Sequence, residues 1–168
     1  MADEKNEATK PTDNWVKVAA LTSALLAVAT ALATLQAGGH SSRVLLNNIA
    51  ASNLWSYYQA KSVKFNILKS ESEVLRALGR RIDAKDANKM AEYQAEMDQI
   101  KKDAEEKQAL AEKNGRLGAL LGKAVTLFQV AIALSAISLL IRRREYWFCG
   151  LGLAAWGVYY VVIRILSA

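Results

Sequence analysis

Proline, cysteine and histidine are nearly absent from this 168-residue chain, where each occurs once, as Pro11, Cys149 and His40. A β-rich fold needs more turn-forming residues than one proline and nine glycines supply. A single cysteine excludes a disulfide within the chain. One histidine and one cysteine are too few for a typical zinc site or a convincing nucleophile–histidine–acid triad. No glycine-rich phosphate loop stands out either. We therefore expect neither an enzyme, nor a cofactor, nor a metal centre.

Charge is scarce in two long parts of the chain and abundant between them. The formal charge is +6 and the hydrophobic fraction is 52%, but residues 15–37 and 117–168 are almost wholly apolar while residues 40–116 are mostly polar. A soluble domain would interleave these classes at helical or strand period. The basic excess is compatible with nucleic acid, yet no RNA-binding or DNA-reading pattern accompanies it. Anionic lipid headgroups also attract Lys and Arg, so we expect the lipid bilayer and no nucleic acid as a partner.

Three apolar runs are long enough to cross a bilayer, at residues 15–37, 117–141 and 146–166. A helix needs roughly 20 apolar residues to cross a ~30 Å hydrocarbon core. Residues 1–14 hold two lysines against four acids, which is the wrong sign for the leading region of a signal peptide. We therefore expect a polar N-terminal tail over 1–14, followed by a retained anchor that ends at Gly38 and Gly39. Residues 142–145 are expected to form a tight turn between the second and third spans.

Small residues recur at helical spacing in all three runs. Such stripes let helix backbones approach closely in a membrane, so we expect helix packing through them. Gln129 is the best candidate for a hydrogen bond between helices, while Lys123 and Arg164 are expected to reach the membrane surface. The expected packing residues are Ala20, Ala24, Ala27, Ala31, Gly118, Gly122, Gln129, Gly150, Ala154 and Gly157.

The orientation follows from the arginines of the 142–145 turn. Lys and Arg of short loops remain in the cytoplasm, which predicts a cytoplasmic turn and N-terminus and a periplasmic 40–116 segment. Five basic residues between Lys101 and Arg116 argue for the reverse. Long segments, however, translocate largely regardless of charge, and fourteen Lys and Arg minus eleven acids leave residues 40–116 at only +3.

The middle segment is predicted to be helical, because residues 40–114 hold no proline and one glycine, Gly79, and good helix formers dominate. Its apolar residues keep a three-four spacing in two phases that do not join across 83–89. We therefore predict a break near Gly79–Asp83, with Asp83 or Asp86 capping a new helix, and an antiparallel coiled-coil hairpin. The first phase contains Leu68, Leu75, Leu78 and Ile82, and the second contains Met90, Tyr93, Met97, Ile100, Ala104 and Ala111.

One part of this segment combines aromatic and basic residues. Residues 14–70 contain no aspartate or glutamate. Two hypotheses remain open for the cluster. Its face could pack against another helix of this chain or of a second copy, or residues 41–70 could lie on the membrane surface with lysines on the headgroups. The cluster consists of Trp55, Tyr57, Tyr58, Lys61, Lys64 and Phe65, of which Trp55, Tyr58 and Phe65 share a helix face with Ser62.

The stretch Ala51–Lys64 reads ASNLWSYYQAKSVK, and it resembles a bacterial family known as domain of unknown function 4337 (DUF4337). The Trp-x-Tyr-Tyr-Gln-Ala-Lys-Ser core carries the resemblance. At Asn53 the family is expected more often to have an acidic residue, so no charge-based role is inferred there. The resemblance implies a bacterial membrane protein with an N-terminal span, a polar helical middle and C-terminal spans, and it implies no activity. We expect the protein in the inner membrane.

Together these patterns predict an all-α membrane protein with three transmembrane helices and an extramembrane antiparallel coiled-coil hairpin between the first and second. The hairpin's apolar spacing is interrupted by alanine and lysine, so we expect stability from association. The predicted function is non-enzymatic: the chain forms a homo-oligomer or docks a protein partner through residues 41–115. The alternative is an oligomeric small channel or transport-accessory subunit, with Lys123, Thr126, Gln129 and Ser135 facing water.

Overall fold

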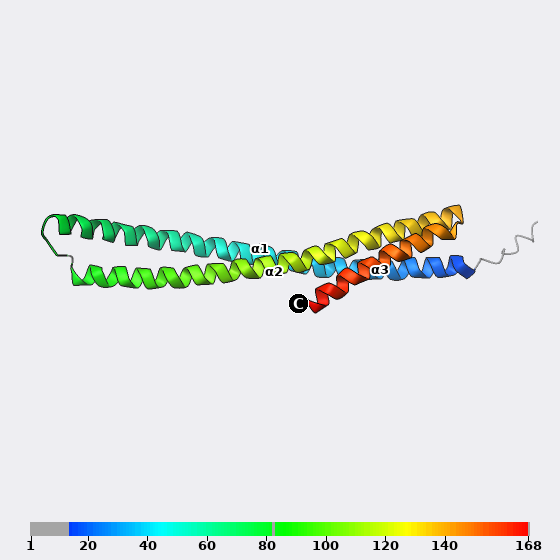
Figure 1. Ribbon diagram of the computed structural model, residues 1–168, viewed down its shortest axis with the longest axis horizontal. Coiled ribbons are helices and arrows are strands. Elements are labelled where there is room, and N and C mark those ends of the chain that lie inside the picture. Colours follow the sequence, from blue (N-terminus) through cyan, green and yellow to red (C-terminus); the bar gives the residue numbers. More distant parts are fainter. Residues whose placement is uncertain (1–13, 82, 168) are drawn as a thin grey trace, which may run out of the picture. The chain divides into compact units, whose positions relative to one another are not determined.

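Three helices account for nearly all of the computed structural model, which describes residues 14–81 and 83–167 (Figure 1). They are α1 (Asn14–Ala77), α2 (Ala84–Ile141) and α3 (Arg144–Leu166). Within the described ranges no residue lies in a strand, which confirms the expected all-α class. The tail, apart from Asn14, and the predicted apolar position Ile82 fall outside the described residues.

Each helix contains a stretch that is apolar and long enough to cross a membrane. Helices α1 and α2 are longer than these stretches. Helix α1 continues without a break through Gly38 and Gly39, where the first apolar run ends, and α2 already extends before Leu117, where the second run begins. Glycine costs about 1 kcal/mol relative to alanine inside a helix but keeps its backbone hydrogen bonds. The end of the first apolar run and the start of the second are therefore changes of composition and not helix ends.

The chain divides into two compact units. Unit 1 contains the described residues up to His40 and from Arg116 onward, and unit 2 is Ser41–Gly115. In unit 2 we call residues 41–77 the α1 arm and residues 84–115 the α2 arm.

The two arms of unit 2 lie side by side (Figure 1). Lys61 of the α1 arm pairs with Glu96 of the α2 arm, and a Cβ placed on Gly115 would lie 3.9 Å from Cγ2 of Val44. The buried apolar side chains between the arms come mostly from the α2 arm. They are Ala51, Met97, Ile100, Ala104 and Ala111.

The connection between the arms confirms the predicted break. Gly79 has φ of 71°, a backbone conformation that glycine adopts without steric cost. Its N–H donates to the Arg76 carbonyl (3.1 Å), and the Arg80 N–H donates to the Leu75 carbonyl (2.9 Å). These two bonds form a Schellman motif, which satisfies the last carbonyls of α1.

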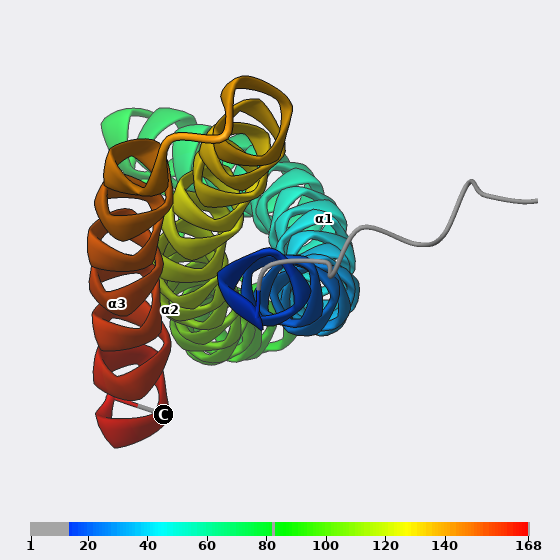
Figure 2. The ribbon, with the colours of Figure 1, turned by 90° about the vertical axis from the view of Figure 1, so that its right-hand side faces the viewer.

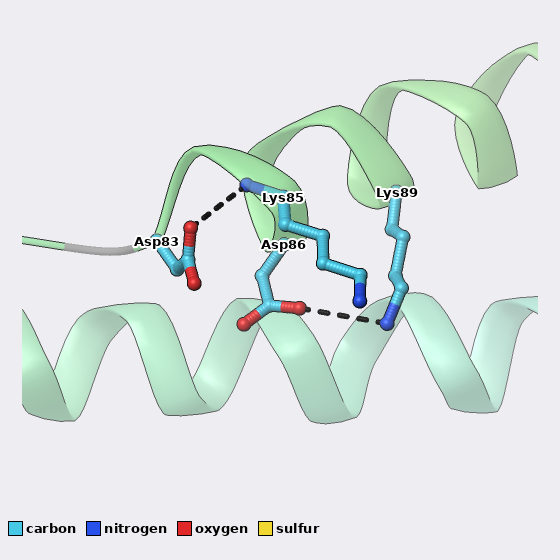
Figure 3. Close-up of polar contacts among 4 residues, drawn as sticks. All are labelled: Asp83, Lys85, Asp86 and Lys89. Atoms are coloured by element: carbon cyan, nitrogen blue, oxygen red, sulfur yellow. Dashed lines mark hydrogen bonds and ion pairs between the residues drawn. The ribbon is translucent and has the colours of Figure 1, made fainter.

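The start of α2 is capped by one of the two predicted aspartates (Figure 3). The Lys85 backbone N–H donates to Oδ1 of Asp83 at 3.0 Å, which satisfies one of the free donors at the helix start. Asp86 lies in the first turn instead, where a carboxylate Oδ1 is 3.6 Å from Nζ of Lys89.

In unit 1, α3 lies against the C-terminal part of α2 (Figure 2). The connection is shorter than the predicted 142–145 turn, because α3 already begins at Arg144. Arg142 has φ of 55°, and Arg143 is extended. The Ser138 hydroxyl closes the turn by donating to the Arg143 carbonyl at 2.6 Å.

The core of unit 1 is a cluster of small residues around one phenylalanine. Phe128 is 2% exposed. Leu26 and Ala29 of α1 pack against the cluster, and Nε1 of Trp147 on α3 donates to the Thr22 hydroxyl of α1 at 3.1 Å. All three helices thus contribute to unit 1. The buried members of the cluster are Ala124, Phe128, Ala131 and Ala154.

Candidate functional site

The aromatic–lysine cluster predicted from the sequence divides between two sides of the α1 arm. Trp55, Tyr58 and Phe65 are half-buried, whereas Tyr57 and Lys64 are exposed. The rings of Trp55 and Tyr58 meet edge to face, with centroids 5.6 Å apart. This geometry is favourable for aromatic pairs, and it holds the half-buried face in a defined arrangement.

Lys61 joins the cluster to the α2 arm. Its side chain is only 12% exposed and pairs with the Glu96 carboxylate. Its Nζ lies 4.9 Å from the ring centroid of Tyr93 and 5.5 Å from that of Tyr57, within the range of cation–π attraction. The hydrogen bond with Glu96 raises the pKa of the Lys61 ammonium above its usual value, although burial opposes the rise. Lys61 is therefore a bridge within unit 2.

These contacts favour the packing hypothesis for the half-buried side of the cluster. Lys61 faces a carboxylate and a tyrosine ring of the α2 arm. Tyr57 and Lys64 are both exposed, and the Tyr57 ring faces Lys61 of its own helix. A role on a membrane surface or a partner therefore remains a prediction for these two.

The exposed side of the α1 arm also carries large apolar residues, each 50% to 66% exposed. On the α2 arm, by contrast, Leu110 is the single large apolar residue that is exposed, at 38%. Exposed apolar residues scattered singly are normal, so the feature that favours an interaction surface here is their larger number on the α1 arm. The set on the α1 arm is Leu45, Leu46, Ile49, Tyr57, Val63, Ile67 and Val74.

The predicted packing residues of the third span lie at the contact between α2 and α3. A Cβ on Gly150 would lie 3.0 Å from the Ala131 carbonyl oxygen, and a Cβ on Gly157 would lie 2.6 Å from the Phe128 ring. Ala154 is buried between them along the helix. Glycine is therefore required at 157 for the close approach of the two helices.

The other small residues are divided between two environments. A Cβ added at Gly118 would lie 3.3 Å from the Cβ of His40, whereas a Cβ added at Gly122 would meet nothing within 4 Å. The alanines predicted to pack in α1 are exposed within this chain, and α1 turns Ala19 and Ala33 inward instead. Packing of the exposed alanines on another copy stays a prediction. They are Ala20, Ala24, Ala27 and Ala31.

The polar residues of the second span do not share one face. Gln129 and Thr126 are exposed, but Ser135 is buried and donates to the Ala131 carbonyl at 2.9 Å. Nζ of Lys123 lies 5.7 Å from the ring centroid of Tyr160. An open groove of about 340 Å³ lies beside it, lined by Lys123, Thr126, Leu127, Leu153, Trp156 and Tyr160.

The contact between His40 and Arg164 was missed by sequence reasoning. Nη2 of Arg164 lies 3.0 Å from Nε2 of His40, and His40 is only 6% exposed. Because a guanidinium has donors only, Nε2 of His40 is the acceptor. Arg164 therefore contacts α1. The sequence had predicted instead that its side chain would reach the membrane surface. His40 is the only histidine of the chain and Arg164 is the one charged residue of the third apolar run, but they are 124 positions apart and no spacing rule pairs them.

No metal-binding constellation appears in the part of the chain that the structure describes: no group of three or more His, Cys, Asp or Glu side chains gathers there. Cys149 is exposed and carries a free thiol.

The described residues thus define an all-helical protein with three helices that are able to span a membrane. The chain belongs to the family described as Domain of unknown function (DUF4337), whose model matches residues 15–167. The resemblance inferred from the Trp55 region is therefore confirmed over nearly the whole chain. No curated protein and no solved structure matches the chain.

Proposed function

We propose that this chain is a multi-pass protein of the bacterial inner membrane, with spans at residues 15–37, 117–141 and 146–166. The length and hydropathy of the three helices support it. So does unit 1, where Leu21, Leu25 and Leu35 of α1 are 62%, 62% and 74% exposed. Apolar side chains turned outward along a hydrogen-bonded helix suit a lipid environment, because lipid supplies no partner for polar groups.

In this proposal the N-terminus and the turn at Arg142–Arg143 are cytoplasmic, and residues 41–115 are periplasmic. The three arginines at 142–144 support this orientation through the positive-inside rule. All three are exposed, as expected for side chains in contact with water and lipid headgroups.

Outside the membrane, residues 41–115 would form an antiparallel coiled-coil hairpin that serves as a non-enzymatic docking element. The observation that carries this proposal is the apolar surface on the outer side of the α1 arm, where Val63 and Ile67 are 58% and 60% exposed. This surface lies outside the proposed spans, so lipid tails do not cover it. A protein surface that removes it from water gains roughly 25 cal/mol for each Å² of apolar area.

The test combines membrane extraction with single-cysteine labelling. Cys149→Ser removes the native thiol, and Lys69→Cys and Glu145→Cys each add one exposed thiol while keeping the three arginines. In intact spheroplasts a membrane-impermeant maleimide should label position 69, and it should label position 145 only after lysis. The inverse pattern would overturn the orientation. Release of the protein from membranes by alkaline carbonate would overturn the membrane proposal itself.

The channel alternative has less support from the structure, because Ser135 is buried and does not share the exposed side of Gln129. It predicts that Gln129→Leu changes ion conductance in reconstituted bilayers. The docking proposal predicts unchanged conductance at background level.

A further inference from the structure

Five of the seven large apolar residues exposed on the α1 arm fall on a single heptad repeat. Starting at Leu46, steps of three and four residues alternate over 28 residues to Val74, and every position reached is exposed. Five of the nine positions hold large aliphatic residues, and the three polar positions hold asparagine or serine. We call this set the outer stripe: Leu46, Ile49, Asn53, Ser56, Ala60, Val63, Ile67, Ser70 and Val74.

The outer stripe lies on the opposite side of the helix from the α2 arm. Ala51, Tyr58 and Phe65 fall midway between stripe positions in the heptad, and these residues are buried or half-buried. Lys61, which binds Glu96 of the α2 arm, belongs to the same inner side. The α2 arm therefore occupies one side of α1 and leaves the stripe open.

A repeat of this period indicates a helical partner. A straight α-helix drifts by about 20° per heptad relative to a strict seven-residue repeat, so a stripe of four heptads would turn by about 80° around it. A stripe that keeps the strict repeat stays in line only along a helix that supercoils around another helix. Solvent or a lipid surface imposes no such period.

The same register extends toward the N-terminus along the sequence. Counting back from Leu46 by four and three, the repeat passes Ser42 and Gly39 and then reaches six large aliphatic residues in α1. These are Leu35, Leu32, Val28, Leu25, Leu21 and Val18, each 45% to 74% exposed. Lipid alone explains apolar residues there, but it does not explain why they keep the heptad phase of the arm.

We propose that the outer stripe pairs with the outer stripe of a second copy of this chain, parallel and in register. A two-fold pair uses the same patch on both subunits, and this stripe is complementary to itself because its apolar positions meet their own counterparts. An asparagine at one core position is a feature of parallel two-stranded coiled coils. In the outer stripe this residue is Asn53, one heptad after Leu46. This inference deepens the docking proposal by naming the partner.

The residues that flank the stripe agree with a parallel pair. Leu46 is followed in the stripe, at multiples of seven residues, by Asn53, Ala60, Ile67 and Val74. In a parallel pair, the residue just before each of these faces the residue five positions further along the sequence of the other copy. Gln59 then faces Lys64 of the second copy, and Asn66 faces Glu71 of the second copy, so no like charges meet. Two copies anchored in one membrane through the same N-terminal span are also constrained to run in the same direction.

The test uses disulfide cross-linking in membrane vesicles on the Cys149→Ser background. Ser56→Cys and Ser70→Cys place thiols in the stripe, while Lys69→Cys and Asn48→Cys place them at exposed positions outside it. A disulfide needs Cα atoms roughly 6 Å apart, so the stripe variants should form at least about tenfold more covalent dimer under mild oxidation than the controls. Positions 56 and 70 lie about 21 Å apart along the helix, so an antiparallel pair cannot cross-link both to themselves.

Efficient dimers at both stripe positions with little at the controls would support the inference. Equal cross-linking of Ser70→Cys and Lys69→Cys would indicate random collision and would overturn it. A dimer at only one stripe position would overturn the parallel register, and no dimer at either would overturn the second copy as the partner. In each failing case, periplasmic labelling of Lys69→Cys would show whether the membrane topology still stands.

Discussion

The two arms of unit 2 differ in how many apolar sides they carry. The α2 arm has one, formed by Met97, Ile100 and Ala104, and this side is buried against the α1 arm. The α1 arm has two, the inner side around Tyr58 and Phe65 and the exposed outer stripe. A helix with one apolar side is completed by one neighbour, whereas a helix with two needs a second.

The charges follow the same division. The α2 arm has fourteen charged residues among 32, and the α1 arm has seven among 37. The α2 arm therefore presents a charged outer surface to water, while the α1 arm presents aliphatic residues separated by small polar ones. Two helices of similar length and helix-forming composition thus differ: one buries its apolar side in the intrachain contact, and the other also has an exposed apolar side.

Truncating one isoleucine in each arm gives the largest expected effect and tests directly whether the two arms differ. Ile100 is 7% exposed and Ile67 is 60% exposed. Ile100→Ala should destabilise the arms by about 2–4 kcal/mol, because it leaves a cavity in a buried contact. Ile67→Ala should leave the free energy of separating the two arms of a single chain nearly unchanged. It should instead weaken the association of two copies. Hydrogen exchange of the arms in dilute detergent measures the first effect. Equal losses in the two variants would show that the arms do not differ as described.

A second prediction extends the comparison to unit 1, where α2 again supplies a buried contact. Gly157→Ala should destabilise the α2–α3 contact by about 1–3 kcal/mol, because the added methyl group overlaps the Phe128 ring. Gly152→Ala on the same helix is the matched control, since nothing lies within 4 Å of its Cβ position. Thermal unfolding in detergent compares the two. A Gly157→Ala melting temperature equal to that of Gly152→Ala would contradict the close approach of α3 and α2.

A third and smaller effect concerns the bridge between the arms. The pKa of Lys61 is raised by its hydrogen bond with Glu96, so the charged lysine stabilises the folded arms. A raised lysine pKa means that this stabilisation is complete at neutral pH and is lost as the pH rises from the usual lysine range through the raised value. The wild-type chain should therefore be more stable than Lys61→Met at neutral pH and lose this advantage in alkali.

Lys69→Met serves as the control for the bridge, because Lys69 is an exposed lysine of the same arm. Its difference in melting temperature from the wild type should stay constant over the same pH range. An advantage of Lys61 over methionine that persists unchanged in strong alkali would contradict the ion pair with Glu96.

Much of the fold follows from local patterns, and these patterns were sufficient where the cause was local. Gly79 and Asp83 mark the end of α1 and the start of α2, because a left-handed turn residue and a side-chain cap act within a few residues. The apolar residues Met97, Ile100 and Ala104 were predicted to share one side, and all three are buried. The continuity of α1 through Gly38 and Gly39 was not foreseen, since composition changes there and helical hydrogen bonding does not.

Contacts between distant segments were not predictable in the same way. The small residues of α1 include two stripes, and spacing alone does not tell whether Ala20 and Ala24 or Ala19 and Ala33 turn inward. The structure buries Ala19 and Ala33. The contact of His40 with Arg164 likewise depends on how α1 and α3 pack. The outer stripe, in contrast, has a regular spacing in the sequence. The aromatic residues on the inner side of the same helix follow a second phase, so the spacing of the stripe did not stand out.

The mass of the intact protein in nanodiscs, measured by native mass spectrometry, tests the pairing of α1 most directly. The double variant Val63→Glu/Ile67→Glu places charges in the outer stripe, and Ala91→Glu/Ala95→Glu places the same charges on exposed positions of the α2 arm. We predict a dimer for the wild type and for the α2-arm variant, and a monomer for the stripe variant. A monomeric wild type, or a stripe variant with the same mass as its control, would contradict the account.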